Sequence, residues 1–72
     1  MQIHDLNRAA FIWAATDESP SIVFTGNQAA FGFSNPGEVA AALAAFESGG
    51  MVEARLFSLR RDALYRRIRG GR

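Results

Sequence analysis

One stretch of the chain decides its fold, and it reads Ser21-Ile22-Val23-Phe24-Thr25-Gly26-Asn27-Gln28-Ala29-Ala30-Phe31-Gly32-Phe33. Two runs of β-branched, aromatic and small residues flank the pair Gly26-Asn27. A glycine-first pair between two such runs is typical of a type II′ turn in a β-hairpin. The stretch therefore predicts antiparallel strands at residues 21–25 and 28–33.

The turn also predicts which side chains share a face of the hairpin. Thr25 and Gln28 flank the turn and pair first, and the register counts outward from them. On this register one face carries Ile22, Phe24, Ala29, Phe31 and Phe33. The other face carries Val23, Ala30 and Gly32. A two-stranded hairpin is not stable alone in water, so we expect helices to cover the aromatic face.

The residues before the hairpin predict a helix. Asp5 is a suitable N-cap, and apolar residues follow it at helical spacing, namely Leu6, Ala9, Ala10 and Trp13. The helix should end near Thr16, because residues 17–20 are a polar break closed by a proline. Trp13 shares the spacing of the core positions, so we interpret it as a core residue rather than an interface anchor.

Two further helices are predicted after the hairpin. Asn35 can cap the first, Pro36 suits its first position, and Glu38 completes a capping box. This helix should end at Gly49-Gly50, where glycine tolerates a left-handed C-cap. The last helix is predicted over residues 53–69, with arginines around two apolar groups. One group is Val52, Leu56, Leu59 and Ala63, and the other is Phe57, Leu64 and Ile68.

Together these elements predict a single α+β domain over residues 1–72. The predicted order is helix, two-stranded antiparallel hairpin, helix, helix (αββαα), with the helices packed on one face of the hairpin. The last three residues, Gly70 to Arg72, are expected to form a frayed tail.

The composition limits how such a domain can be stabilised, because its 72 residues include no cysteine and one histidine. Domains of this size usually depend on disulfides, a metal or a partner chain. Disulfides are excluded by the lack of cysteine, and a multi-histidine metal site by the single histidine. We therefore expect no cofactor. We expect self-association as a homodimer, through the second face and the open edge of the hairpin.

The titratable residues do not form a catalytic pattern. His4 beside Asp5 resembles a general base with an orienting carboxylate. The sequence offers no nucleophile and no oxyanion hole to accompany them. Asp17 and Glu18 are adjacent carboxylates in a polar loop. We therefore predict that the chain is not an enzyme.

The sequence shows no signal for export or membrane insertion. No basic segment precedes its first apolar stretch, and no run approaches the ~18 apolar residues that a membrane span requires. We therefore expect a cytoplasmic protein without a membrane partner.

The basic residues are concentrated at one end of the chain. All eight are arginine, and seven of them lie from Arg55 to the C-terminus. The six candidates for contact with nucleic acid or an acidic partner are Arg55, Arg60, Arg61, Arg66, Arg67 and Arg69. A third interpretation is that the arginines form a solvated helix face, in which Asp62 pairs with Arg66. The arginines are spread around the helix, which weakens a groove-binding interpretation.

Several short motifs follow one another in an order that is informative. They are Asp5-Leu6, Ala9-Ala10-Phe11, Phe31-Gly32-Phe33, Asn35-Pro36, Ala45-Phe46-Glu47-Ser48-Gly49, Val52, Leu56-Phe57, Leu64 and Ile68. In this order they resemble a family of small bacterial and phage-associated domains of unknown function. The resemblance implies a phage or mobile-element setting, and it implies no catalytic residue, cofactor or substrate. Arg8 departs from the family pattern, which has an apolar residue there.

The Phe-Gly-Phe strand before a helix start also resembles one strand of an RNA-recognition motif, whose aromatic side chains stack on bases. That fold needs a four-stranded sheet, and the chain before Phe31 is too short to supply it. We therefore predict a small accessory or protein-interaction module. Nucleic-acid binding through the arginine-rich helix is the alternative.

Overall fold

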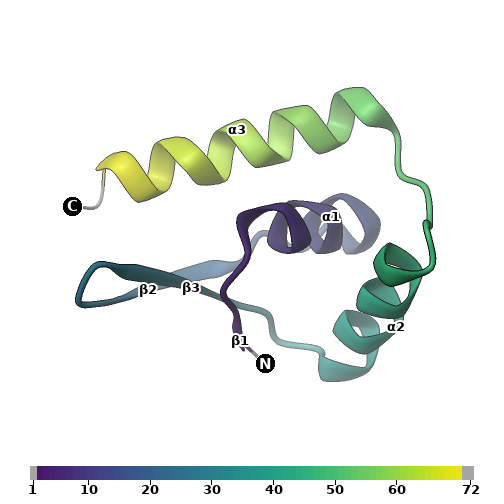
Figure 1. Cartoon of the computed structure of the whole chain (residues 1–72), viewed down its shortest axis with the longest axis horizontal. Coiled ribbons are helices and arrows are strands. Elements are labelled where there is room, and N and C mark those ends of the chain that lie inside the picture. The colour runs from purple at the N-terminus through teal and green to yellow at the C-terminus, as the bar shows by residue number, and fades with distance from the viewer. Residues whose placement is uncertain (1, 71–72) are drawn as a thin grey trace.

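The predicted helices and hairpin all form in the computed structural model, which describes residues 2–70 (Figure 1). The elements in chain order are β1 (Gln2–Ile3), α1 (Leu6–Thr16), β2 (Ser21–Thr25), β3 (Gln28–Gly32), α2 (Pro36–Glu47) and α3 (Ala54–Gly70). The α+β class is confirmed, with the helices packed on the sheet. The strand β1 is an addition to the predicted order.

The sheet has the strand order β1-β3-β2, and both pairings are antiparallel. The predicted hairpin register is confirmed, with Thr25 paired to Gln28 at the turn. Gly26 has φ +62° and Asn27 is not in the positive-φ region, which is the pattern of a type II′ turn. On the other side of β3, Ile3 of β1 pairs with Phe31. Ile3 lies outside the helices and strands that the sequence predicts.

The central helix of the fold is α1, which packs against both α2 and α3 (Figure 1). Its N-cap is Asp5 as predicted, whose carboxylate accepts a hydrogen bond from the Asn7 N–H at 3.3 Å. Five consecutive residues, Ala9 to Trp13, are buried. The prediction that Trp13 is a core residue is therefore confirmed.

The two later helices begin and end close to their predicted positions. At the start of α2 the Asn35 side chain accepts a hydrogen bond from the Glu38 N–H at 3.1 Å, and Pro36 is the first helical residue. Gly49 ends the helix with φ +79°. The helix α3 extends through Gly70, so the predicted frayed tail does not include that residue. The other two residues of that tail lie outside the described range.

Within α3 only Leu64 is buried, and Ala63 of the other apolar group packs partly buried against the core. Leu64 has no exposed surface, and Phe57 and Ile68 pack against the same core. Leu59, which we predicted to belong to the apolar face, is 55% exposed. The reason is that α3 contacts α1 through the side that carries Leu64, and Leu59 lies about 140° around the helix from it.

The aromatic face of the hairpin is covered at its base and open near its tip. Phe31 and Phe33 are buried in the core, and Ile22 is half-buried. Phe24, expected on the covered face, is 37% exposed, because the tip of the hairpin extends beyond α1 (Figure 1). Ala30 was expected on the second face of the hairpin, with Val23 and Gly32. It is buried, and it lies on β3, the central strand of the sheet. Because Phe31 of β3 and Phe33 just after it are both buried, neither ring is available for base stacking.

Candidate interaction surfaces

The Asp5 carboxylate, considered as the orienting group for His4, has a structural role in the fold. His4 is exposed, while Asp5 caps α1 and also pairs with Arg8 at 2.9 Å. Arg8 further reaches Glu47 of α2 at 2.6 Å, and its guanidinium lies over the ring of Phe46. The hydrogen bond with Glu47 raises the pKa of Arg8 above its ordinary value. Arg8 thus joins α1 to α2 through its charge, at a position where the family pattern described above has an apolar residue.

The adjacent carboxylates after α1 also have structural partners. Asp17 takes a left-handed conformation with φ 61° and pairs with Arg60 at 3.2 Å. Glu18 accepts a hydrogen bond from the Ser34 N–H at 2.8 Å, which ties the loop to the end of the sheet. Across residues 2–70, no three His, Cys, Asp or Glu side chains are grouped closely enough to hold a metal ion.

Two of the six candidate arginines pack on the tryptophan. The guanidinium carbons of Arg60 and Arg67 lie 4.6 Å and 5.0 Å from the centre of the Trp13 ring. They are seven residues apart on α3, so they occupy the same side of that helix. Arg67 also donates to the Pro20 carbonyl at 3.3 Å. Both side chains thus attach α3 to the end of α1.

The other four candidate arginines differ in the contacts that their side chains make within the fold. Arg61 donates to the Asn7 side chain of α1 at 2.9 Å. Arg66 donates to the backbone carbonyl of Asp62, whereas the alternative of a solvated helix face paired it with the Asp62 side chain. Arg69 lies over the ring of Tyr65, with its guanidinium carbon 5.8 Å from the ring centre. Arg55 is exposed at the start of α3. The six therefore do not form one basic surface.

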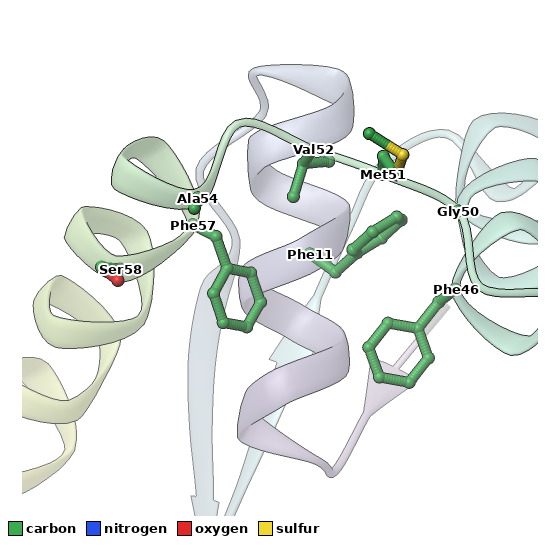
Figure 2. A pocket seen from close by; sticks show the side chains of 8 residues that line it. All are labelled: Phe11, Phe46, Gly50, Met51, Val52, Ala54, Phe57 and Ser58. Atoms are coloured by element: carbon green, nitrogen blue, oxygen red, sulfur yellow. The ribbon is translucent and has the colours of Figure 1, made fainter.

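An apolar groove lies where the three helices meet beneath the α2–α3 linker (Figure 2). Each helix contributes one ring, namely Phe11 from α1, Phe46 from α2 and Phe57 from α3. The rings of Phe11 and Phe46 contact edge to face, with centres 5.3 Å apart. Met51 of the linker is 93% exposed at the rim. The open groove measures about 440 Å³ and offers one hydroxyl, that of Ser58, so its chemistry is almost wholly hydrophobic.

The second apolar feature of the surface is the strand β2. It pairs with β3 on one side, and no strand among residues 2–70 pairs with its other edge. Val23 is 46% exposed and Phe24 is 37% exposed. Residues 21–25 contain no charge and no proline. Natural edge strands usually carry such residues, which prevent pairing with another chain.

The backbone groups at this edge follow from the hairpin register. In a two-residue hairpin the closing pair, here Thr25 and Gln28, is hydrogen-bonded, and bonded pairs then alternate along the strand. The N–H and C=O groups of Val23 therefore point toward β3. Those of Ile22 and Phe24 point outward, where they can accept another strand.

Comparison with protein-family models, with curated proteins and with solved structures gives no match for this chain. Over residues 2–70, none of the helices combines the length and the apolar character that spanning a membrane requires. The candidate function therefore depends on the geometry of the surfaces described above.

Proposed function

We propose that this chain is a non-catalytic protein-interaction module of the cytoplasm, and that it works as a homodimer joined through β2. The observation that carries the proposal is the uncharged, unpaired edge of β2 beside the exposed Val23 and Phe24. The family resemblance adds a phage or mobile-element setting to the proposal.

The small size of the domain supports self-association. A chain of about 60–70 residues buries only about 60% of the surface that its unfolded form exposes, so a partner chain adds stability that the core alone lacks. This chain has no disulfide to supply it. Pairing through β2 would satisfy the outward N–H and C=O groups of Ile22 and Phe24 and cover two exposed apolar side chains.

The proposal is tested by placing a charge on β2 and measuring the mass in solution. Val23→Lys sets two like charges against each other at a paired edge, and a lysine at a half-exposed position leaves the fold of the single chain intact. The matched control is Met51→Lys, which adds the same charge at an exposed apolar residue of the groove rim.

Sedimentation equilibrium should give twice the 7.8 kDa chain mass for the wild type and for Met51→Lys. Val23→Lys should give the monomer mass with an unchanged far-UV circular dichroism spectrum. A monomeric wild type contradicts the proposal. So does a dimer that Met51→Lys dissociates and Val23→Lys does not, because that result would place the interface at the groove.

Nucleic-acid binding is the second candidate, and the exposed face of α3 favours it. Arg55, Arg66 and Arg69 are exposed there, and their spacing places them along one side of the helix over about 21 Å. Such a row can contact phosphates, although it would carry no sequence information. Asp62 lies within the same row and opposes an anionic ligand.

A fluorescence-anisotropy titration with a short labelled duplex at two salt concentrations tests this candidate. Binding that weakens steeply as salt rises, and that is lost when Arg55, Arg66 and Arg69 are all changed to Gln, supports it. The control changes only Glu53 and Asp62 to neutral amides, which should strengthen binding. Absence of binding at low salt removes the candidate.

A further inference from the structure

We infer that two copies pair β2 with β2 in one antiparallel register, with a two-fold axis passing beside Val23, so that the two sheets continue as one. This inference rests on the proposed self-association and adds to it the register and the residues in contact. It follows from the outward backbone groups of β2, the order of its side chains and their exposure.

The backbone groups select this register. The residues of β2 whose N–H and C=O groups point outward are Ile22 and Phe24, and a two-fold axis at Val23 places Ile22 of one copy opposite Phe24 of the other. Each such pair exchanges two hydrogen bonds, as bonded antiparallel pairs do. Both outward residues are then satisfied on each copy.

The neighbouring symmetric registers satisfy fewer groups. An axis at Ile22 sets Phe24 opposite Pro20, which has no N–H to donate. An axis at Phe24 sets Ile22 opposite Gly26, which lies in the turn with φ +62° rather than in a strand. Only the axis at Val23 keeps both outward residues opposite strand residues.

The side chains agree with the same register. Ile22 and Phe24 lie on the helix-covered face of the sheet, so the exposed Phe24 ring of one copy meets the half-buried Ile22 of the other. Aromatic and β-branched residues form favourable cross-strand pairs. On the opposite face the two exposed Val23 side chains contact each other. Ser21 lies opposite Thr25, so that hydroxyls face hydroxyls at both ends of the pairing.

Single cysteine variants test the register, because the chain has no cysteine of its own and any thiol is the introduced one. In this register the Val23 residues of the two copies form a non-hydrogen-bonded pair, with Cα atoms about 4.5 Å apart. That separation suits a disulfide. Val23→Cys should therefore form a covalent dimer under mild oxidation, seen on a non-reducing gel and reversed by a reductant.

The matched controls use the ends of the same strand. Two copies of Ser21 lie four residues apart along the paired strands, at about 14 Å, which is beyond the ~7 Å limit for a disulfide. Ser21→Cys or Thr25→Cys alone should stay unlinked, and an equimolar mixture of the two should link. The mixture also provides an independent reading of the register if Val23→Cys folds poorly.

The outcomes separate this inference from the proposed function. A wild type that sediments as a monomer overturns the self-association itself. A wild-type dimer in which neither Val23→Cys nor the mixture links overturns the register alone. A dimer in which Ser21→Cys links with itself overturns it as well, because that link requires a different axis.

Discussion

Replacing Arg60 by alanine tests whether part of the arginine-rich helix serves the fold rather than a ligand. The guanidinium of Arg60 lies over Trp13 and pairs with Asp17, and its side chain is 29% exposed. These contacts belong to the folded chain and need no partner. We therefore expect Arg60→Ala to destabilise the domain.

The expected size of the effect follows from the contacts that are removed. A partly desolvated cation–π contact contributes about 1 kcal/mol, and two packed methylenes contribute about 0.8 kcal/mol each. The ion pair adds little, because the Asp17 side chain is 89% exposed and exposed pairs contribute about 0–1 kcal/mol. The Nε atom of Arg60 is buried without a hydrogen-bond partner. Removing it abolishes a desolvation penalty and so offsets about 1 kcal/mol of the lost stability. The net loss is about 1.5 kcal/mol.

Urea unfolding followed by circular dichroism at one fixed protein concentration measures this loss. A loss of that size corresponds to a decrease of roughly 6–12 °C in Tm for a domain of this length. Arg66→Ala is the matched control, since its side chain is exposed and contacts only the local backbone; it should change stability by less than about 0.5 kcal/mol. Asp17→Asn removes the charge while keeping a residue type that tolerates the left-handed backbone, so it isolates the ion pair.

Equal stability of Arg60→Ala and Arg66→Ala would refute this reasoning. The guanidinium of Arg60 would then not be engaged with Trp13. Arg60 and Arg67 would return to the set of cations available to an outside ligand, and the nucleic-acid candidate would gain support.

Substitutions at three further positions test the fold. Leu64→Ala, at a residue with no exposed surface, should cost about 2–5 kcal/mol in urea unfolding; a cost below 1 kcal/mol would mean that α3 does not pack on α1 as described. Asn35→Ala should cost about 1 kcal/mol through the lost N-cap and Asn35→Ser much less, and equal losses would contradict the cap. Gly49→Ala should cost about 1–2 kcal/mol, since φ is +79° with open space around the Cβ position, and a neutral melt would count against the left-handed C-cap.

The parts of the fold that could be predicted are those with local chemical signals. The turn at Gly26-Asn27 sets the hairpin register, and Asn35-Pro36 marks a helix start, because each depends on residues that are adjacent in sequence. Strand β1 has two residues, too few for an alternating pattern, and it forms only because β3 is present to pair with it.

The exposure of individual residues was less predictable than the elements. Alternation assigns Phe24 to a face of the hairpin, but it does not tell how far along the strands the helices cover that face. Similarly, the apolar spacing of α3 includes both Leu59 and Leu64, and only packing against α1 decides which of the two is buried.

The candidate site residues show the same division. The arginines could be located from sequence, and the seven-residue spacing of Arg60 and Arg67 indicates a shared side of a helix. Their contact with Trp13 joins residues more than forty positions apart, which no local pattern reveals. An open edge of the hairpin was predictable, because two paired strands leave outer edges without a neighbour. That the open edge is the one on β2 was not predictable, since it depends on β1 pairing with β3.

Amide hydrogen exchange of β2, measured by NMR at low and high protein concentration, observes the proposed interface atom by atom. The N–H of Val23 points toward β3 and should be protected at both concentrations. The N–H groups of Ile22 and Phe24 point outward, and they should exchange rapidly in dilute solution and slow down together as the concentration rises. Rapid exchange of Ile22 and Phe24 at every concentration, with Val23 protected throughout, would show that no second copy binds this edge.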